Sequence, residues 1–440
     1  MALNTFPRPP FQFESEHPDK QLLVYLKEST PWYLTEEAKR QLRDLDPDGE
    51  LNKQREPVIG LWEAVLRDAL RGLKKHDPRE CGAEKQPIDF ESFFDEHSLG
   101  TERLSEVLKA FSKFESLMYG AQPQRYRDHV AHTLRVWIIG HGLLKQCLAG
   151  KLDADPLFDD SISPEEWECI WAMTALCHDI GYPLTAVDRI NDRTRQALEG
   201  QGLHHLGDLR YGFSPWIQPL QETILQLMAS KVVEVPPALR REEQAHVTHL
   251  QNKYYMKFLN SLDRLEHGVV SALIVGRSLV YFLESDLCHD PFDPLSEEDA
   301  RQFLIRREIL RAIAAHTCPE IYHLSFRTLA FLLFIVDELQ CWGRPTFEQL
   351  MEEMQPHHND EVTLKAFSPD RIDIEVVAAG NWEQRKRAAE RQLNGIHKRL
   401  RLAVGTPMLG ALRLRYEVKT EGDKGCFIEL RDGRIEEGKL

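Results

Sequence analysis

Apolar residues recur at the three- and four-residue spacing of amphipathic helices over most of this chain, and alternating runs are rare before residue 365. The pattern predicts a mostly α-helical protein. Its longest runs lie between residues 120 and 345, which we expect to form a helical bundle core. A Pro- and Phe-rich arm and a helical extension over 1–119 precede that core. The predicted helices cover 20–45, 58–75, 101–119, 126–148, 165–180, 216–231, 253–284, 301–316 and 323–341.

The pattern changes after residue 365. Residues 371–377 alternate between apolar and polar, which is typical of a half-buried strand. We expect a linker over 346–365 and a small α+β module over 366–440, with the order β-α-β-β. Its elements are predicted at 371–377 (strand), 382–402 (helix), 412–418 (strand) and 426–430 (strand).

Composition and charge narrow the class of protein. With 440 residues, 42% of them hydrophobic, the chain can bury a large core. A net charge of −15 argues against general nucleic-acid binding. No stretch reaches the roughly 20 apolar residues of a membrane span, and the first residues lack a secretory signal. The eight cysteines form no CxxC pair, so we expect free thiols, a cytoplasmic protein and no membrane partner.

One adjacent pair of polar residues carries most of the chemical information. His178 and Asp179 end an apolar, helix-like run, just before Gly181 and Pro183, which are expected to stop the helix. Two strongly hydrated side chains in such a setting are costly unless something pairs with them. Imidazole nitrogen and carboxylate oxygen are both ordinary ligands of divalent metals. The pair is therefore a candidate metal site.

Three further residues strengthen this interpretation. Asp337 follows eight apolar residues late in a predicted helix; a buried ion pair with an arginine is the alternative. His267 is predicted inside a long helix beside Gly268. A glycine destabilises a helix relative to alanine, and its presence is easier to understand if another group approaches the backbone there. The alternative is that His267 is a core histidine hydrogen-bonded to a carbonyl. His316 ends a helix, where a cationic cap on the helix dipole is equally compatible.

A fourth histidine must be chosen from two. On a helix, His132 shares a fully apolar face with Val136 and Leu143, whereas His129 shares its face with Thr133. The core-facing position favours His132 as the ligand. His129 is then the second choice, as a ligand or as a neighbouring contact for the substrate.

The ordered set resembles the HD superfamily of metal-dependent phosphohydrolases, which has an all-helical fold. The resemblance covers roughly 120–345 and neither flank. Its local patterns are His-Thr-x-x-Val at 132–136, His-Asp-Ile-Gly at 178–181, His-Gly-x-x-Ser-Ala at 267–272 and Asp-Glu-Leu-Gln-x-Trp-Gly-Arg at 337–344.

The resemblance implies the ligand sets. His132, His178, Asp179 and Asp337 would hold one metal ion. His267 and His316 would hold a second ion, with Asp179 bridging the two. One or two divalent ions are expected, of manganese, magnesium, nickel, zinc or iron.

The resemblance also implies a reaction. We expect hydrolysis of a phosphate ester or anhydride, most readily in a nucleotide, by a metal-activated water, with Asp179 and His178 at the catalytic centre. Arg264, Arg311 and Arg344 lie near the ligands and could bind phosphate, Arg311 and Arg344 with a catalytic role. His129 is a further substrate contact. The partner is thus a small phosphorylated substrate, and the C-terminal module is a candidate for self-association.

Two other functions remain open at this point. The same six-ligand pattern occurs in HD-fold diiron oxygenases, which would be distinguished by iron content and a visible absorption band. A non-catalytic binding or signalling module could retain the metal for structure alone.

Overall fold

The structure is a computed structural model. It describes residues 18–49, 51–75, 100–119, 129–148, 150–153, 161–199, 201, 218–235, 244–283, 294–323, 327–340, 361–368, 371–377, 398–399, 413–419, 425–431 and 434–439.

A buried helix lies at the centre of the fold. All side chains of α8 (Pro164–Cys177) from Glu166 to Cys177 are buried, as expected for a helix that is apolar on every side. A capping box fixes its start: Ser163 accepts a hydrogen bond from the Glu166 amide, and the Glu166 carboxylate accepts one from the Ser163 amide. The register of α8 is thereby set up to His178, which immediately follows its last residue.

Among the described elements, five helices make the main contacts with α8. They are α3 (Arg55–Lys75), α7 (His129–Cys147), α12 (His267–Ser278), α14 (Glu297–Ala315) and α15 (Leu329–Leu339). The start of α7, the end of α14 and the last turns of α15 bring candidate ligands close to the end of α8.

The N-terminal extension packs on this core through α1 (Pro18–Glu28), α2 (Glu36–Asp44), the short 3-10 helix η1 (Leu51–Lys53) and α6 (Thr101–Tyr119). A buried ion pair attaches it. Arg135 of α7 donates from Nε and Nη2 to the two carboxylate oxygens of Asp19, both at 2.7 Å. Such two-pronged geometry is the strong form of the Arg–carboxylate interaction.

The predicted helix over 253–284 is three helices in the structure. They are α11 (Asn252–Asp263), α12 (His267–Ser278) and α13 (Val280–Leu283). Leu265 has a φ of 49° and ends α11 in the left-handed conformation. His267 therefore begins a helix instead of lying inside one.

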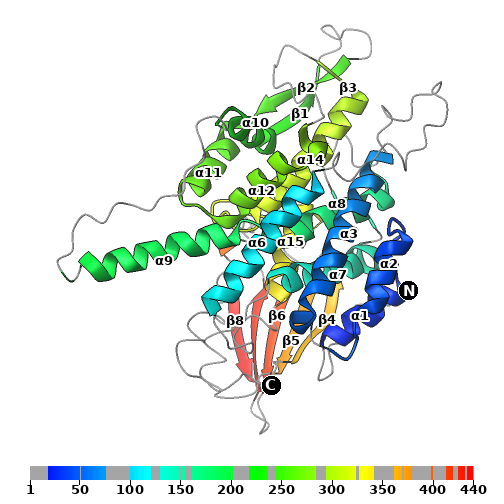
Figure 1. Cartoon of the computed structure of the whole chain (residues 1–440), viewed down its shortest axis with the longest axis vertical. Coiled ribbons are helices and arrows are strands. Elements are labelled where there is room, and N and C mark those ends of the chain that lie inside the picture. Colours follow the sequence, from blue (N-terminus) through cyan, green and yellow to red (C-terminus); the bar gives the residue numbers. More distant parts are fainter. Residues whose placement is uncertain are drawn as a thin grey trace.

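Other elements were not predicted. α9 (Tyr182–Glu199) follows directly after Gly181, with Pro183 in its first turn, and extends away from the body (Figure 1). After α10 (Gln218–Ala229), the chain forms an antiparallel sheet. Its strands are β1 (Ser230–Glu234), β2 (Gln244–Leu250) and β3 (Leu295–Ser296).

The C-terminal module is a five-stranded sheet at the end of the molecule opposite β1–β3 (Figure 1). Its strands, in spatial order, are β4 (Glu361–Ser368), β5 (Arg371–Val377), β6 (Arg413–Lys419), β7 (Gly425–Arg431) and β8 (Arg434–Lys439). Only β5 and β6 pair in parallel. β4 begins at Glu361, inside the range predicted as linker, and β8 was not predicted; the predicted helix over 382–402 lies outside the described residues except for 398–399.

The prediction of a mostly α-helical fold with a small α+β part is confirmed. Among the described helices, none combines the length and apolar character that crossing a bilayer requires. The domain boundaries and the cytoplasmic location stay predictions.

A buried histidine joins the C-terminal segment to α15. The ring of His323 stacks on Phe334 with centroids 5.2 Å apart, and its backbone amide donates to the Arg399 carbonyl at 3.1 Å. Burial, aided by the Arg399 charge, lowers the pKa of His323 to about 3.

This burial predicts acid sensitivity. An unfolded histidine titrates near pH 6.5. Between that pH and about pH 3, His323 therefore binds a proton in the unfolded chain but not in the folded chain. The free energy of unfolding is therefore undiminished by this group above about pH 6.5. As pH falls from there toward 3, protonation of His323 in the unfolded chain lowers it by about 1.4 kcal/mol per pH unit. His323→Phe keeps a ring against Phe334, and urea unfolding at pH 7 and pH 5 should show a smaller acid loss than in wild type. His249→Phe, at an exposed position of β2, is the control; an unchanged pH dependence in His323→Phe would contradict the assignment.

Candidate metal centre

Five elements bring six ligand-type side chains together at the end of α8. His132 comes from the first turn of α7, and His178 and Asp179 from the turn after α8. The other three lie at the start of α12, directly after α14 and late in α15: His267, His316 and Asp337. Their ligand atoms form two groups, each within 4.8 Å, that share Asp179.

The turn after α8 must approach α12 closely. The Gly181 amide donates to Ser271 Oγ at 2.8 Å. A Cβ at Gly181 would lie 2.7 Å from the Ser271 nitrogen and 2.8 Å from the His267 carbonyl oxygen. Only glycine fits here without movement, so Gly181 allows Asp179 to lie beside His267.

Gly268 has the same function between α12 and α14. A Cβ there would lie 2.6 Å from Thr317 Oγ1 and 2.7 Å from the Ile313 carbonyl oxygen. The Gly268 amide also donates to Thr317 Oγ1 at 3.0 Å. The close approach expected beside His267 is thus made by the end of α14, which carries His316.

The first group joins α7, α8 and α15. His132 Nε2 lies 3.0 Å from Asp337 Oδ1 and 3.4 Å from Asp179 Oδ2. His178 Nε2 lies 3.6 Å from Asp179 Oδ2 and 3.8 Å from Asp337 Oδ1. The two histidine Nε2 atoms are 3.3 Å apart. Four ligand atoms therefore surround one small volume.

The second group uses the other oxygen of the same carboxylate. Asp179 Oδ1 lies 3.2 Å from His267 Nε2 and 3.4 Å from His316 Nε2. Each oxygen of Asp179 thus faces a different group. Asp179 could therefore contribute one oxygen to each group.

Partners on the far side of the rings fix their orientation. His178 Nδ1 lies 2.8 Å from the Ala175 carbonyl oxygen, and His316 Nδ1 lies 2.6 Å from that of Ile313. His132 Nδ1 contacts Gln340 Oε1. Each of these oxygens is an acceptor, which assigns the ring proton to Nδ1 and leaves the Nε2 lone pair facing the carboxylates.

Such a cluster fits a divalent metal. Neutral Nε2 lone pairs and carboxylate oxygens repel one another across 3.0–3.8 Å unless a proton or a metal ion lies between them. Histidines that bind a metal through one ring nitrogen usually donate the N–H of the other to an oxygen, as these three do. His132, His178, Asp179 and His316 are each at most 3% exposed, so these ligand atoms have little contact with bulk solvent.

The electrostatics of the buried groups point the same way. Burial would raise the pKa of Asp179, but His178, His267 and His316 outweigh it and hold that pKa well below its usual value. Burial lowers the pKa of His316 to about 4, so its imidazole is neutral at pH 7. Burial also acts to lower the pKa of His178, but Asp179 and Asp337 outweigh it and raise that pKa. Protons and a metal ion therefore compete at His178.

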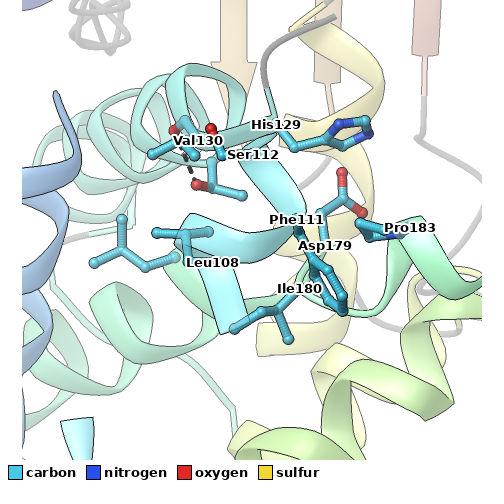
Figure 2. Close-up of a pocket in the computed structure, with 10 residues that line it drawn as sticks. Leu108, Phe111, Ser112, His129, Val130, Asp179, Ile180 and Pro183 are labelled. Atoms are coloured by element: carbon cyan, nitrogen blue, oxygen red, sulfur yellow. Dashed lines mark hydrogen bonds between the residues drawn. The ribbon is translucent and has the colours of Figure 1, made fainter. Parts of the chain in front are cut away.

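Next to the cluster lies a small hollow, seen in Figure 2. His129 and Asp179 lie together at one side of it, and apolar side chains such as Leu108 and Ile180 line the rest. The His129 ring stacks on Tyr182 with centroids 4.1 Å apart, and Tyr182 meets His267 edge-on at 5.4 Å. The structure thus places His132 in the ligand group and His129 beside it.

The predicted arginines lie elsewhere or outside the described residues. Arg264 pairs with Glu320 at 3.0 Å, and its side chain is 46% exposed. Arg311 donates to the carbonyl oxygens of Met228 at 2.6 Å and Ser230 at 2.7 Å, in the α10–β1 connection. Neither guanidinium is brought to the cluster by these contacts. Arg344 lies outside the described residues, and the substrate roles of all three stay predictions.

Two residues at the cluster were missed by sequence reasoning. Gln340 lies three residues after Asp337, and that spacing on a helix could have suggested a shared face. Tyr182 had no sequence signal other than its position after His178 and Asp179.

His129→Ala should separate a substrate contact from a ligand. Because the His129 ring lines the hollow and is absent from both ligand groups, the variant should retain the metal content of wild type. Its KM for the substrate should rise while metal affinity stays unchanged. Metal analysis after gel filtration measures the metal content of the variant. Loss of metal would show that His129 is a ligand.

Comparisons with protein-family profiles, with curated proteins and with solved structures find no match for this chain.

Proposed function

We propose that this protein is a metal-dependent phosphohydrolase that cleaves a phosphate ester or anhydride, in a nucleotide or a related small phosphate. The observation that carries the proposal is the position of Asp179, whose Oδ1 faces His267 and His316 while Oδ2 faces His132 and His178. Two cation positions bridged by one carboxylate suit a reaction in which water attacks phosphorus.

The six side chains account for the binding of the ions. His132, His178, Asp179 and Asp337 would hold one, and Asp179, His267 and His316 the other. When bound, such ions acidify water to hydroxide near neutral pH and neutralise charge on phosphoryl oxygens.

The charge of the site explains how a strongly acidic protein attracts an anion. The chain carries −15 overall, and the six residues include two carboxylates. Two divalent ions exceed that pair of negative charges, which leaves a positive site in an acidic surface. The substrate phosphate is therefore expected to be drawn to the cluster itself.

The exposed fractions of the six side chains support one side of the cluster as the approach for the substrate. His267 and Asp337 have side chains that are 17% and 21% exposed, whereas those of His132, His178 and His316 are 0% exposed. His129 and the hollow adjoin Asp179. We propose that His129 contacts the substrate or its leaving group there.

The test is phosphate release by the purified full chain. Nucleoside mono-, di- and triphosphates, cyclic nucleotides and p-nitrophenyl phosphate are each assayed with manganese, magnesium, nickel, zinc or ferrous ion, and again after chelation. Release that requires the metal supports the proposal. If no phosphate is released from any substrate while iron-loaded protein consumes oxygen with an organic substrate, the oxygenase replaces it; metal binding with neither reaction would indicate the non-catalytic module.

A further inference from the structure

Arg399 reaches the end of α14, where His316 lies. The guanidinium of Arg399 contacts the carbonyl oxygens of Ala315 and His316 through Nη2 and Nη1, and Nη2 lies 3.5 Å from that of Cys318. These carbonyls belong to the last residue of the helix and the turn that follows it. Arg399 is therefore held against the end of α14.

Arg399 also contacts α15. Its guanidinium lies over the ring of Phe334, 4.5 Å from the centroid, and Phe334 is three residues before Asp337. The Arg399 carbonyl accepts the His323 amide at 3.1 Å, and the His323 ring stacks on the same Phe334. One side chain thus joins two ligand-bearing helices to the C-terminal segment.

A helix end requires such a partner. The last carbonyls of a helix have no amide within the helix to accept from, and they carry the negative end of its dipole. A planar guanidinium can donate to several of them at once, which an ammonium on a flexible stem does less well. Arg399 therefore holds the last turn of α14 in place.

The last turn of α14 in turn sets the His316 ring. His316 Nδ1 donates to the Ile313 carbonyl, one turn back, and this bond aims Nε2 at Asp179 Oδ1, 3.4 Å away. If the turn frays, the acceptor and the ring move together. The contact with Phe334 lacks such directionality, and Arg399 acts on Asp337 through the attraction of opposite charges, which does not fix an orientation.

We propose that Arg399 is a positioning residue for the second metal group, Asp179, His267 and His316, so that its contacts with the end of α14 determine how tightly the second ion binds. The proposal rests on metal binding by the cluster, as the proposed function does, and is independent of which reaction follows.

Manganese binding tests it in the full chain. Metal-free wild type, Arg399→Gln, Arg399→Lys and the neighbouring exposed-position control Lys398→Gln are titrated with Mn²⁺, and the EPR spectrum is recorded. Wild type and Lys398→Gln should bind two ions and show a spin-coupled pair. Arg399→Gln should keep the first ion and bind the second about tenfold to a hundredfold more weakly, as for other outer-shell changes, with an uncoupled spectrum. Arg399→Lys should lie between.

Each other outcome counts against the proposal. Wild-type binding of both ions by a folded Arg399→Gln would overturn it, and so would an equal loss of both ions in a variant that keeps its circular dichroism. If Arg399→Gln does not fold, the test uses Arg399→Lys. Wild-type binding of both ions by that variant, or an equal loss of both ions, would overturn the proposal. Wild type that binds no Mn²⁺ would overturn this inference and the proposed function together, whereas wild type with two ions and no phosphate release would overturn only the latter.

Discussion

Asp179→Ala should remove both metal ions and abolish turnover. Its carboxylate is the only group of the cluster shared by both ligand sets, with Oδ2 3.4 Å from His132 Nε2 and Oδ1 3.2 Å from His267 Nε2. Loss of a ligand should exceed the roughly tenfold to hundredfold effect of outer-shell changes. We therefore expect metal affinity and kcat/KM to fall more than a hundredfold, in about equal measure.

The stability of the same variant should fall with and without metal. Asp179 is 3% exposed, and His178, His267 and His316 hold its pKa well below the usual value, so the ionised carboxylate stabilises the folded chain even without a cation. Removing one partner from a buried group of charges is destabilising. The free energy of unfolding of Asp179→Ala should therefore be lower than that of wild type with chelator present, and the difference should be larger with manganese present, because the ion stabilises only wild type.

Asp192→Ala is the matched control, because Asp192 forms an exposed pair with Arg195 on α9. It should leave metal content, turnover and both unfolding energies unchanged. Full activity and metal content in Asp179→Ala would show that the carboxylate is structural.

The second large effect is a separation of the two ligand sets. His267→Ala and His316→Ala should each lose the second ion and keep the first, because their Nε2 atoms face only Asp179 Oδ1 among the six ligand residues. His132→Ala should lose the first ion, since its Nε2 lies 3.0 Å from Asp337 and 3.4 Å from Asp179. All three should release phosphate far more slowly than wild type.

Equilibrium titration with manganese, followed by EPR, measures which ion remains. The two single-ion species should differ, because one keeps two carboxylates and the other keeps one. His129→Ala, beside the cluster on the same helix as His132, is the control that should keep both ions. If every histidine variant lost both ions together, the two sets would not be separable sites.

Periodicity predicted the helices well where each helix has one continuous apolar face. α3, α6, α7 and α10 begin within three residues of the predicted ranges, because burial against one core imposes a single period. The split between α11 and α12 depends on the left-handed conformation of Leu265, a residue with no sequence preference for it. β1 and β2 were not predicted, because their antiparallel pairing depends on contacts between two segments and not on a pattern within either one.

The candidate ligands were recognisable because each is a polar residue in an apolar, helical setting. Their spatial grouping depends on helix packing, and the sequence showed it only through the resemblance. The roles of Gly181 and Gly268 as close-approach positions are read only from the distances to neighbouring backbone. The partners of Arg311 and Arg399 lie 60 or more positions away along the chain, so tertiary contacts decide them.

The metal content of the protein tests the central claim most directly. The full chain is purified without chelator, dialysed against manganese, passed through gel filtration and analysed by inductively coupled plasma mass spectrometry. The account predicts two ions per chain in wild type and none in Asp179→Ala. Wild type that holds no metal, and takes up none on addition of manganese, would contradict it.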